Sequence, residues 1–273
     1  MISSAPTVSE LAKSITDRPY LSWSQCQSYQ FCPQKFCFQY VEQIEPEFTP
    51  STLCFGSAIH SAISLHHEAQ LEGIATPQVD KLLNLVRDDL EPTTAPIRYN
   101  KNEDQDMLLE LAERMLLAFF KSDHAVAQGK LLCIEEGVSG SVDQELPDIT
   151  GYIDLVTITD AGLIVTDYKT TRSAWSAAKA EENAAQLRLY GELLKMRFDD
   201  ELAIAKLQFV TITKAKSPKV VAHTVASSDE KLKATVDQIR EVWKGIEAGV
   251  FPTRPGWICK QCQFQSKCDS AAI

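Results

Sequence analysis

The sequence predicts an α/β protein in which helices flank a mixed central β-sheet. Two observations carry this prediction. Segments in the first half of the chain repeat apolar residues at helical spacing, and β-branched segments bounded by turn residues begin after Gly129. Two further helical segments follow among these strands, an order typical of helices that pack on a sheet. With 273 residues and 44% hydrophobic content, the chain can bury one sizeable core.

Helices are expected in the first half of the chain. Apolar residues share one face in three segments, at residues 55–72, 78–92 and 104–122. Residues 22–41 predict one or two short helices that break near Pro33, because proline interrupts a helix interior. Residues 1–20 are expected to form an irregular lead-in, and residues 91–102, which contain two prolines, a loop.

Strands dominate the second half of the chain. They are expected at residues 131–142, 149–159, 163–170, 207–215 and 219–225. The short turn at residues 160–162 makes the second and third strands a hairpin, and the last two strands are expected to pair. Helices are expected at residues 175–196 and 228–247, the latter entered through Ser227 or Ser228 and closed by Gly249.

Charge and apolar runs restrict the class of protein. The net charge of −10 counts weakly against nucleic-acid binding, although a basic groove can coexist with an acidic remainder. Charged residues make up 23% of the chain, so disorder is not expected. No apolar run approaches the roughly 20 residues that span a membrane, and the first residues lack the apolar region of a signal peptide. We therefore expect a cytoplasmic protein without a membrane partner.

An acidic pair and a lysine form the sharpest motif. Asp154 ends the segment GYID, and Asp167 and Lys169 lie in the next strand, VTDYKTT. The tight turn lets the two carboxylates meet, and strand alternation puts Asp167 and Lys169 on one face. Two carboxylates and a strand carbonyl suit Mg²⁺ or Mn²⁺, beside which a lysine can hold or help deprotonate the attacking water. Taken alone, an ordinary ion pair at a strand end also explains the motif.

Three other residues fit around this motif. His60 lies in the helix expected at residues 55–72. Gln186 and Tyr190 are four residues apart in the helix expected at 175–196, so they share a face. In isolation, a surface histidine and a routine polar pair remain the simpler interpretations.

The ordered series FGSAIH, GYID, DYKTT and QLRLY resembles the RecB-type branch of the PD-(D/E)XK nucleases, from about Leu21 to Cys268. The resemblance implies a restriction-endonuclease-like core and a metal-dependent DNA nuclease. Asp in place of the commoner Glu in D-x-K is also frequent in this branch. The resemblance assigns Mg²⁺ or Mn²⁺ to His60, Asp154, Asp167 and the Tyr168 carbonyl, catalysis to Lys169, and positioning of DNA or of the lysine to Gln186 and Tyr190.

Eight cysteines, six of them in two groups of three, indicate metal or catalysis rather than disulfides in a cytosolic chain. Cys259-x2-Cys262-x5-Cys268 supplies three thiolates, and Cys32 is the expected fourth, with Cys26 and Cys37 as rivals. The residues alone leave buried thiols, a structural Zn²⁺ site and an iron–sulfur cluster open. The two remaining cysteines, Cys54 and Cys133, are expected in the core.

The same resemblance favours the cluster. RecB-like enzymes such as AddB, the exonuclease V family and the CRISPR-associated adaptation nucleases pair a lone N-terminal cysteine with a C-terminal C-x2-C-x5-C triplet, and these bind a 4Fe-4S cluster. It implies such a cluster here, held by Cys32, Cys259, Cys262 and Cys268. Its expected role is structural, because it would close a loop of more than 200 residues.

The predicted organisation is a single nuclease domain over residues 1–273, with a mainly helical part (1–128), the PD-(D/E)XK core (129–250) and an iron–sulfur tail (251–273). The implied activity is that of an exonuclease on single-stranded DNA or DNA ends, in repair or recombination. A CRISPR-adaptation nuclease that trims spacer precursors would use the same site. A catalytically silent DNA-binding subunit and a zinc-stabilised binding module are further alternatives.

The sequence also indicates candidate partners and DNA contacts. The chain has no Walker A motif, so unwinding would come from a partner helicase, and CRISPR adaptation proteins are the alternative partners. Several residues near the motifs are candidate DNA contacts, although a solvated surface or core position is the simpler interpretation of each. They are the basic Arg172, Arg188, Lys214 and Lys216, and the aromatic Trp175 and Tyr168, which could stack on a base.

Overall fold

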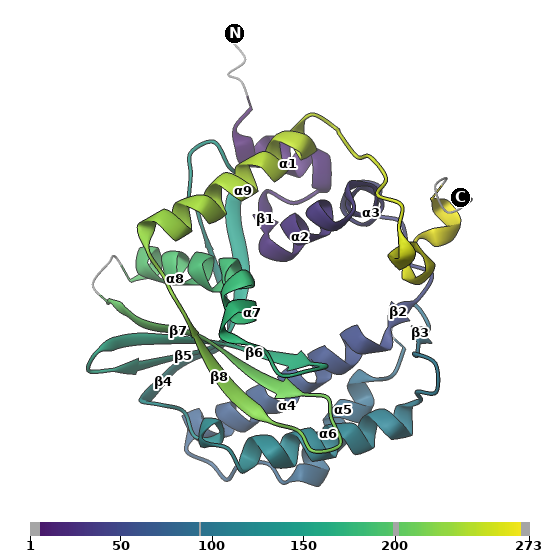
Figure 1. The fold of residues 1–273 in the computed structure, drawn as a ribbon. Helices are drawn as coiled ribbons and strands as arrows, with labels where there is room; N and C mark the ends of the chain where they lie inside the picture. Colours follow the sequence, from purple (N-terminus) through teal and green to yellow (C-terminus); the bar gives the residue numbers. More distant parts are fainter. Residues whose placement is uncertain (1–5, 93, 199–201, 269–273) are drawn as a thin grey trace. The chain divides into compact units, whose positions relative to one another are not determined.

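A computed structural model describes residues 6–92, 94–198 and 202–268 (Figure 1). The chain divides into two compact units, each assembled from segments that are distant in sequence. Unit 1 takes the residues up to Phe48, then Val138–Gly151, then those from Asp229 onward. Unit 2 takes Thr49–Gly137 and Tyr152–Ser228.

Unit 1 joins N-terminal helices to the last helix of the chain. α1 and α2 both pack against α9. The hydroxyl of Tyr29 donates to the Val250 carbonyl at 2.6 Å and lies so close to Gly245 that a side chain there would collide with it. The elements of unit 1 are α1 (Val8–Thr16), β1 (Tyr20–Ser22), α2 (Trp23–Phe31), α3 (Pro33–Phe36), a π-helical turn (Cys37–Val41), α9 (Asp229–Glu247) and two 3₁₀ turns (Trp257–Gln261 and Gln265–Lys267).

The prediction of an irregular lead-in at residues 1–20 is wrong where Val8–Thr16 form the helix α1. Thr7 and Glu10 form a capping box in which each side chain accepts a hydrogen bond from the other's backbone N–H, and this starts a helix. The predicted break near Pro33 is confirmed. α2 ends at Phe31, and Pro33 begins α3 at the position where a helix does not need the missing N–H.

Most of the mixed β-sheet lies in unit 2. Hydrogen bonds connect its strands in the order β1-β5-β6-β7-β8, and β4 also pairs with β5. β5 with β6 and β7 with β8 are antiparallel, whereas β6 and β7 are parallel. The predicted hairpin and the predicted pairing of the last two strands are therefore confirmed. The strands are β4 (Lys130–Gly140), β5 (Asp148–Thr159), β6 (Gly162–Thr171), β7 (Ile204–Thr213) and β8 (Val220–Val225).

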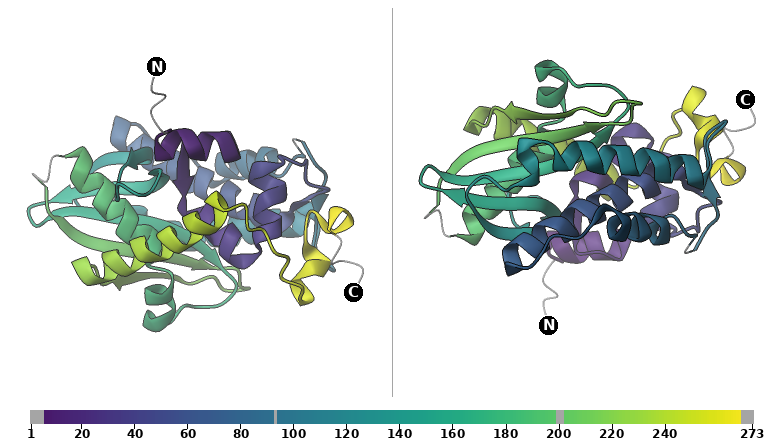
Figure 2. Two further views of the ribbon diagram at one scale, coloured as in Figure 1. Left: turned by 90° about the horizontal axis from the view of Figure 1, so that it is seen from above. Right: turned by 90° about the horizontal axis from the view of Figure 1, so that it is seen from below.

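Helices cover both faces of the sheet in unit 2 (Figure 2). α4 (Ser51–Glu72), α5 (Val79–Asp89) and α6 (Gln105–Phe120) pack on one face and bury a core that includes Phe55, Phe119 and Val210. The opposite face contacts α7 (Ala177–Glu182) and α8 (Ala185–Arg197). Two short strands, β2 (Thr49–Pro50) and β3 (Ile97–Arg98), pair in parallel, the second of them inside the predicted loop.

The single helix predicted over residues 175–196 is wrong, because two helices occupy this segment. The Asn183 side chain donates to the Lys179 carbonyl at 2.7 Å where α7 ends, and α8 begins two residues later. Asparagine favours such an end because its amide competes with the backbone for hydrogen bonds. Within the described ranges, no helix is long and apolar enough to cross a membrane.

Candidate active site

The backbone ladder between β5 and β6 ends just before the acidic pair. The last paired residues are Leu155 and Thr166. Two residues beyond Thr166, the N–H of Tyr168 donates to the side chain of Asp154, at 2.6 Å from Oδ2. Asp154 and Asp167 are both buried, with 8% and 2% of their surface exposed, and their charges interact. The hairpin therefore brings the two predicted carboxylates together.

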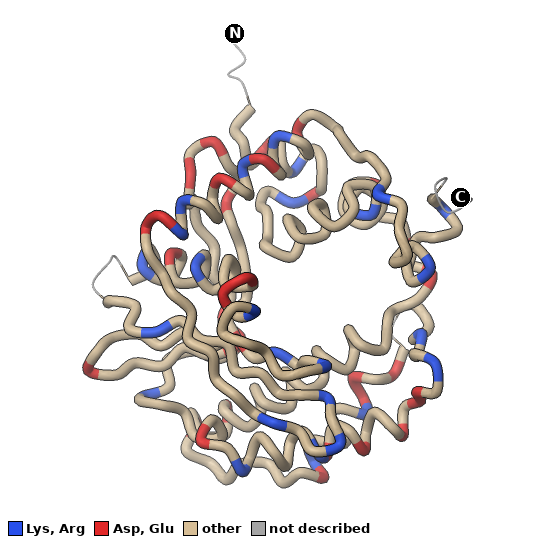
Figure 3. Tube along the Cα trace, in the orientation of Figure 1, with Lys and Arg blue, Asp and Glu red and all other residues tan. Residues whose placement is uncertain are grey.

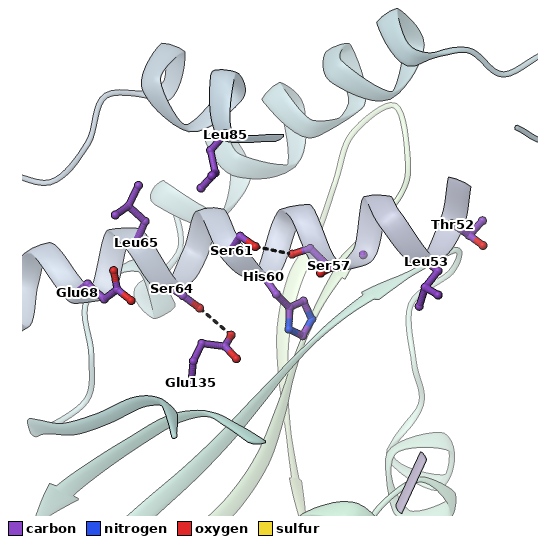
Figure 4. A pocket seen from close by; sticks show the side chains of 11 residues that line it. Thr52, Leu53, Ser57, His60, Ser61, Ser64, Leu65, Glu68, Leu85 and Glu135 are labelled. Carbon is purple, nitrogen blue, oxygen red and sulfur yellow. Dashed lines mark hydrogen bonds between the residues drawn. The ribbon is translucent and has the colours of Figure 1, made fainter. Parts of the chain in front are cut away.

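Helix α4 and strand β4 add two further ligand groups. His60 Nδ1 lies 3.3 Å from Asp154 Oδ2, and Glu135 of β4 completes a group whose ligand atoms all lie within 4.8 Å of one another. Ser64, one turn beyond His60, donates its hydroxyl to Glu135 Oε1 at 2.8 Å (Figure 4). An imidazole and two carboxylates are a suitable donor set for a divalent cation. Asp167 lies outside this group and pairs with a lysine.

Glu135 is not among the ligands that the sequence predicts. Its backbone φ is +48°, in the left-handed region, which a residue with a side chain enters at a cost of about 1–3 kcal/mol. Such a residue interrupts the regular alternation of a strand and re-aims a side chain. The sequence shows only a Glu135–Glu136 doublet before Gly137, and alternation does not reveal which glutamate faces the site. Glu136 forms an ion pair with Arg197 instead.

Lys169 stands on the same face of β6 as Asp167. Its ammonium lies 2.7 Å from Asp167 Oδ2 and donates to Gln186 Oε1 at 3.3 Å. Gln186 Nε2 in turn donates to the hydroxyl of Tyr190 at 2.7 Å, one turn along α8. A continuous chain of polar contacts therefore connects the lysine with the two helix residues that the sequence singled out.

Burial displaces the pKa values of the groups in this cluster. It raises the pKa of Asp167 to about 6, because the neighbouring Asp154 adds to the rise and Lys169 offsets only part of it. Burial also raises the pKa of Glu135, again with Asp154 adding. For His60 and Lys169 burial lowers the pKa, but the carboxylates outweigh it and both pKa values rise. The cluster thus holds an excess of carboxylates that a bound cation would stabilise.

A pocket of about 710 Å³ opens beside the ligand group. One face of α4 supplies most of its lining, and α5 and β4 contribute one residue each (Figure 4). Four hydroxyl side chains from α4 and the His60 ring line this space, so a polar substrate can reach the ligand group through it. The lining residues are Thr52, Leu53, Gly56, Ser57, His60, Ser61, Ser64, Leu65, Glu68, Leu85 and Glu135.

A sequence model of the PD-(D/E)XK nuclease superfamily matches residues 20–269. The chain belongs to this superfamily. The resemblance carried by the four ordered motifs is therefore confirmed at the level of the superfamily, and the protein is a nuclease. Members of this superfamily usually use divalent cations such as Mg²⁺ or Mn²⁺, in agreement with the His, Glu and Asp group on α4, β4 and β5.

Comparison with solved structures supports the fold. A candidate exonuclease from Eubacterium rectale is 11% identical, with a TM-score of 0.56 over 96% of this chain and 92% of that chain. This likeness confirms the predicted restriction-endonuclease-like fold. A second structure, of the protein SSO0001, is 15% identical over 83% of this chain and 88% of that chain, but its TM-score of 0.37 is too low to support an argument. No curated protein sequence matches significantly.

The Tyr168 side chain of this nuclease is not available for stacking on a base. Strand alternation turns it away from its neighbours Asp167 and Lys169, toward the opposite face of the sheet. There it is buried, and its hydroxyl lies 2.8 Å from His67 Nε2. The contact joins β6 to α4, the helix that carries His60, so it helps to hold the two elements of the site together.

The four cysteines that the resemblance assigns to a cluster line one pocket in unit 1. Lys35 and Arg254 lie beside them. Neither Cys26 nor Cys37 lines this pocket. Cys26 is fully buried, and the thiol of Cys37 donates to Glu42. The four cysteines are Cys32, Cys259, Cys262 and Cys268.

Proposed function

We propose that this nuclease hydrolyses phosphodiester bonds in DNA with a divalent cation bound by His60, Asp154 and Glu135. One observation carries the proposal: this ligand group and the ion pair between Asp167 and Lys169 converge where the β5–β6 ladder ends. A cluster of buried carboxylates with a fixed lysine is the arrangement that metal-assisted hydrolysis of a phosphodiester requires.

A bound cation would act as a Lewis acid toward the phosphate and the attacking water. Asp167 and the Tyr168 carbonyl, which the resemblance names as ligands, would complete its coordination. The carboxylates raise the pKa of Lys169 even though burial lowers it, so its ammonium keeps its proton near neutral pH. Lys169 is therefore proposed to stabilise the negative charge that develops on the phosphate. Gln186 and Tyr190 hold the ammonium in this position.

Both Mg²⁺ and Mn²⁺ fit the carboxylates of this donor set. His60 adds an imidazole nitrogen, which transition metals accept more readily than Mg²⁺ does. We therefore propose Mn²⁺ as the more effective of the two cations.

The proposed substrate is DNA with a single strand or a free end, cut exonucleolytically in repair or recombination. The order of the four motifs, which resembles that of the RecB-type nucleases, supports this choice. A helicase is the proposed partner where a duplex must be opened.

We also propose that Cys32, Cys259, Cys262 and Cys268 hold a 4Fe-4S cluster. Among the described residues, no three of these sulfurs lie within 4.8 Å of one another. A tetrahedral zinc site needs sulfurs only about 3.8 Å apart, because Zn–S bonds are about 2.3 Å long. A cluster that takes one thiolate on each iron tolerates the wider spacing. Its role would be to tie the segment that carries Cys32 to the tail of the chain.

The test is a cleavage assay on protein purified without air. End-labelled single-stranded and duplex DNA are incubated with Mn²⁺ or Mg²⁺, with and without a chelator. Lys169→Ala should lower cleavage by about 10²–10³-fold or more without changing the circular dichroism spectrum. Lys206→Ala is the matched control, since this lysine of β7 donates to Gln128 away from the ligand group, and it should cleave as the wild type does. Cleavage that persists in Lys169→Ala or in chelator would contradict the proposal.

A further inference from the structure

The catalytic face of the sheet carries aromatic rings beside the acidic pair. Phe209 of β7 is the cross-strand neighbour of Asp167, and His223 of β8 is the neighbour of Phe209. Cross-strand neighbours share a face, so the three side chains form a row beside Lys169. The Lys169 ammonium lies 6.0 Å from the centroid of the Phe209 ring.

Trp175 covers this row from the segment that connects β6 to α7. Its ring centroid lies 5.3 Å from that of Phe209, edge to face, and 6.4 Å from that of His223. The Phe209 ring therefore contacts the indole on one side and approaches the Lys169 ammonium on another. Trp175 and Lys169 thus both lie beside the same ring, Phe209, on one face of the sheet.

The indole is held in place and remains partly exposed. The next residue, Ser176, caps α7 by accepting from the Lys179 N–H at 3.1 Å. His223, the other ring against which Trp175 packs, is fixed by Thr211, whose Oγ1 lies 3.1 Å from His223 Nε2. An aromatic side chain that is already ordered loses little entropy when a base stacks on it.

Unpaired cations lie along the same end of β6 and β7. Arg172 directly follows β6 and is exposed, and Lys216 is exposed in the connection between β7 and β8. Figure 3 marks the Lys and Arg positions along the chain in blue. The Lys214 N–H donates to the Thr171 carbonyl at 2.7 Å, which joins the two segments. Neither Arg172 nor Lys216 forms an ion pair with a carboxylate in the described part of the chain.

The remaining candidate contacts are already engaged. Arg188 pairs with Glu181 and donates to the Ala226 carbonyl. The Lys214 ammonium lies 5.0 Å from the centroid of the Phe55 ring and is attracted by Glu103. Of the six candidate contacts named from the sequence, Trp175, Arg172 and Lys216 thus remain able to receive a nucleic acid.

We propose that Trp175 stacks on the base next to the scissile phosphate, while Arg172 and Lys216 bind phosphates of the same strand. This inference rests on the proposed cleavage of DNA. It also specifies the substrate, because stacking on Trp175 selects single-stranded DNA or a frayed end. A base inside a duplex is stacked on both sides and cannot reach the indole, whereas any unpaired base can use it.

The first experiment compares two substitutions of the same residue. Trp175→Leu keeps apolar bulk against Phe209 but removes the aromatic face, whereas Trp175→Phe keeps a ring. On end-labelled single-stranded DNA with Mn²⁺, Trp175→Leu should lower kcat/KM by about 5- to 150-fold, chiefly through KM, and Trp175→Phe should retain most of the activity. If Trp175→Leu cleaves as the wild type does, the inference is wrong.

The second experiment leaves the protein unchanged and alters the DNA. A series of substrates carries one abasic nucleotide at successive positions around the cleaved bond. Wild-type cleavage should fall at one position by the same factor that Trp175→Leu causes, and Trp175→Leu should be insensitive at that position. If both proteins respond alike at every position, no base stacks on Trp175.

A DNA-binding assay tests this inference independently of the proposed cleavage. With chelator present, a short oligothymidylate should quench the tryptophan fluorescence of the wild type, and Trp175→Phe should lose that quenching. Replacing Arg172 and Lys216 by Gln should reduce the slope of log Kd against log salt by about 0.7 per residue. Lys81→Gln, an exposed lysine of α5, is the control and should not change the slope. Equal quenching in wild type and Trp175→Phe, or an unchanged slope, would overturn the inference even if the enzyme cleaves DNA.

Discussion

Acid should weaken the fold through His67, and replacing this residue should remove the effect. His67 is a buried residue of α4, and its Nε2 lies 2.8 Å from the hydroxyl of Tyr168 in β6. Burial lowers its pKa to about 4, and the adjacent His66 adds to the decrease, while a hydrogen bond with Gln70 opposes it. The folded protein therefore keeps this imidazole neutral where the unfolded chain protonates it.

The direction and size of the effect follow from linkage. Because the folded pKa lies below the unfolded value of 6.5, the stability contributed by neutral His67 is complete above about pH 6.5 and declines toward about pH 4. Each pKa unit corresponds to about 1.36 kcal/mol, so the full loss is about 3 kcal/mol, of which about 2 kcal/mol has occurred at about pH 5.

Urea unfolding in the presence of a chelator, monitored by circular dichroism at about pH 7.5 and about pH 5, measures this loss of stability. His67→Gln cannot titrate, so wild type should lose about 2 kcal/mol more than this variant between the two pH values. Tyr168→Phe is the matched control. It removes the hydroxyl contact but keeps the histidine, and should retain the pH dependence of the wild type. A difference between wild type and His67→Gln that stays constant with pH would refute the reasoning.

Three further outcomes are expected. Glu135→Gln should weaken Mn²⁺ binding by about tenfold or more in calorimetry, because it removes a carboxylate ligand, whereas Glu136→Gln should bind as the wild type does. His60→Ala should narrow the advantage of Mn²⁺ over Mg²⁺ in cleavage rate, since the nitrogen ligand is lost; an unchanged ratio of the two rates would exclude His60 as a ligand. Cys262→Ser should abolish the visible absorbance of an iron–sulfur cluster and lower the melting temperature, whereas Cys133→Ser should keep the absorbance. A Cys262→Ser protein that keeps its colour would remove Cys262 from the ligand set.

Secondary structure was predictable to the extent that local periodicity decides it. The predicted bounds of five elements are correct within a few residues. They are the strands that contain GYID and DYKTT and the helices α4, α5 and α6. α1 could be missed because a capping box, and not an apolar stripe of typical length, starts it. The break at Asn183 depends on a single side chain, so the composition of residues 175–196 does not show it.

By itself, the sequence determined the directions of side chains that share one element. Alternation along a strand put Asp167 and Lys169 on one face, and the helical repeat put Gln186 and Tyr190 on another single face. Such relations depend only on the backbone geometry of the element, which is the same in every fold.

Only the tertiary structure decided which elements meet and which residues complete the site. His60 reaches Asp154 because α4 packs against the sheet, and Glu135 joins them because its left-handed backbone re-aims one residue of β4. Likewise, packing left Trp175 partly exposed on the face of the sheet that carries Asp167 and Lys169, and it buried Tyr168 on the other face. These outcomes come from contacts between segments distant in sequence, and no local repeat encodes them.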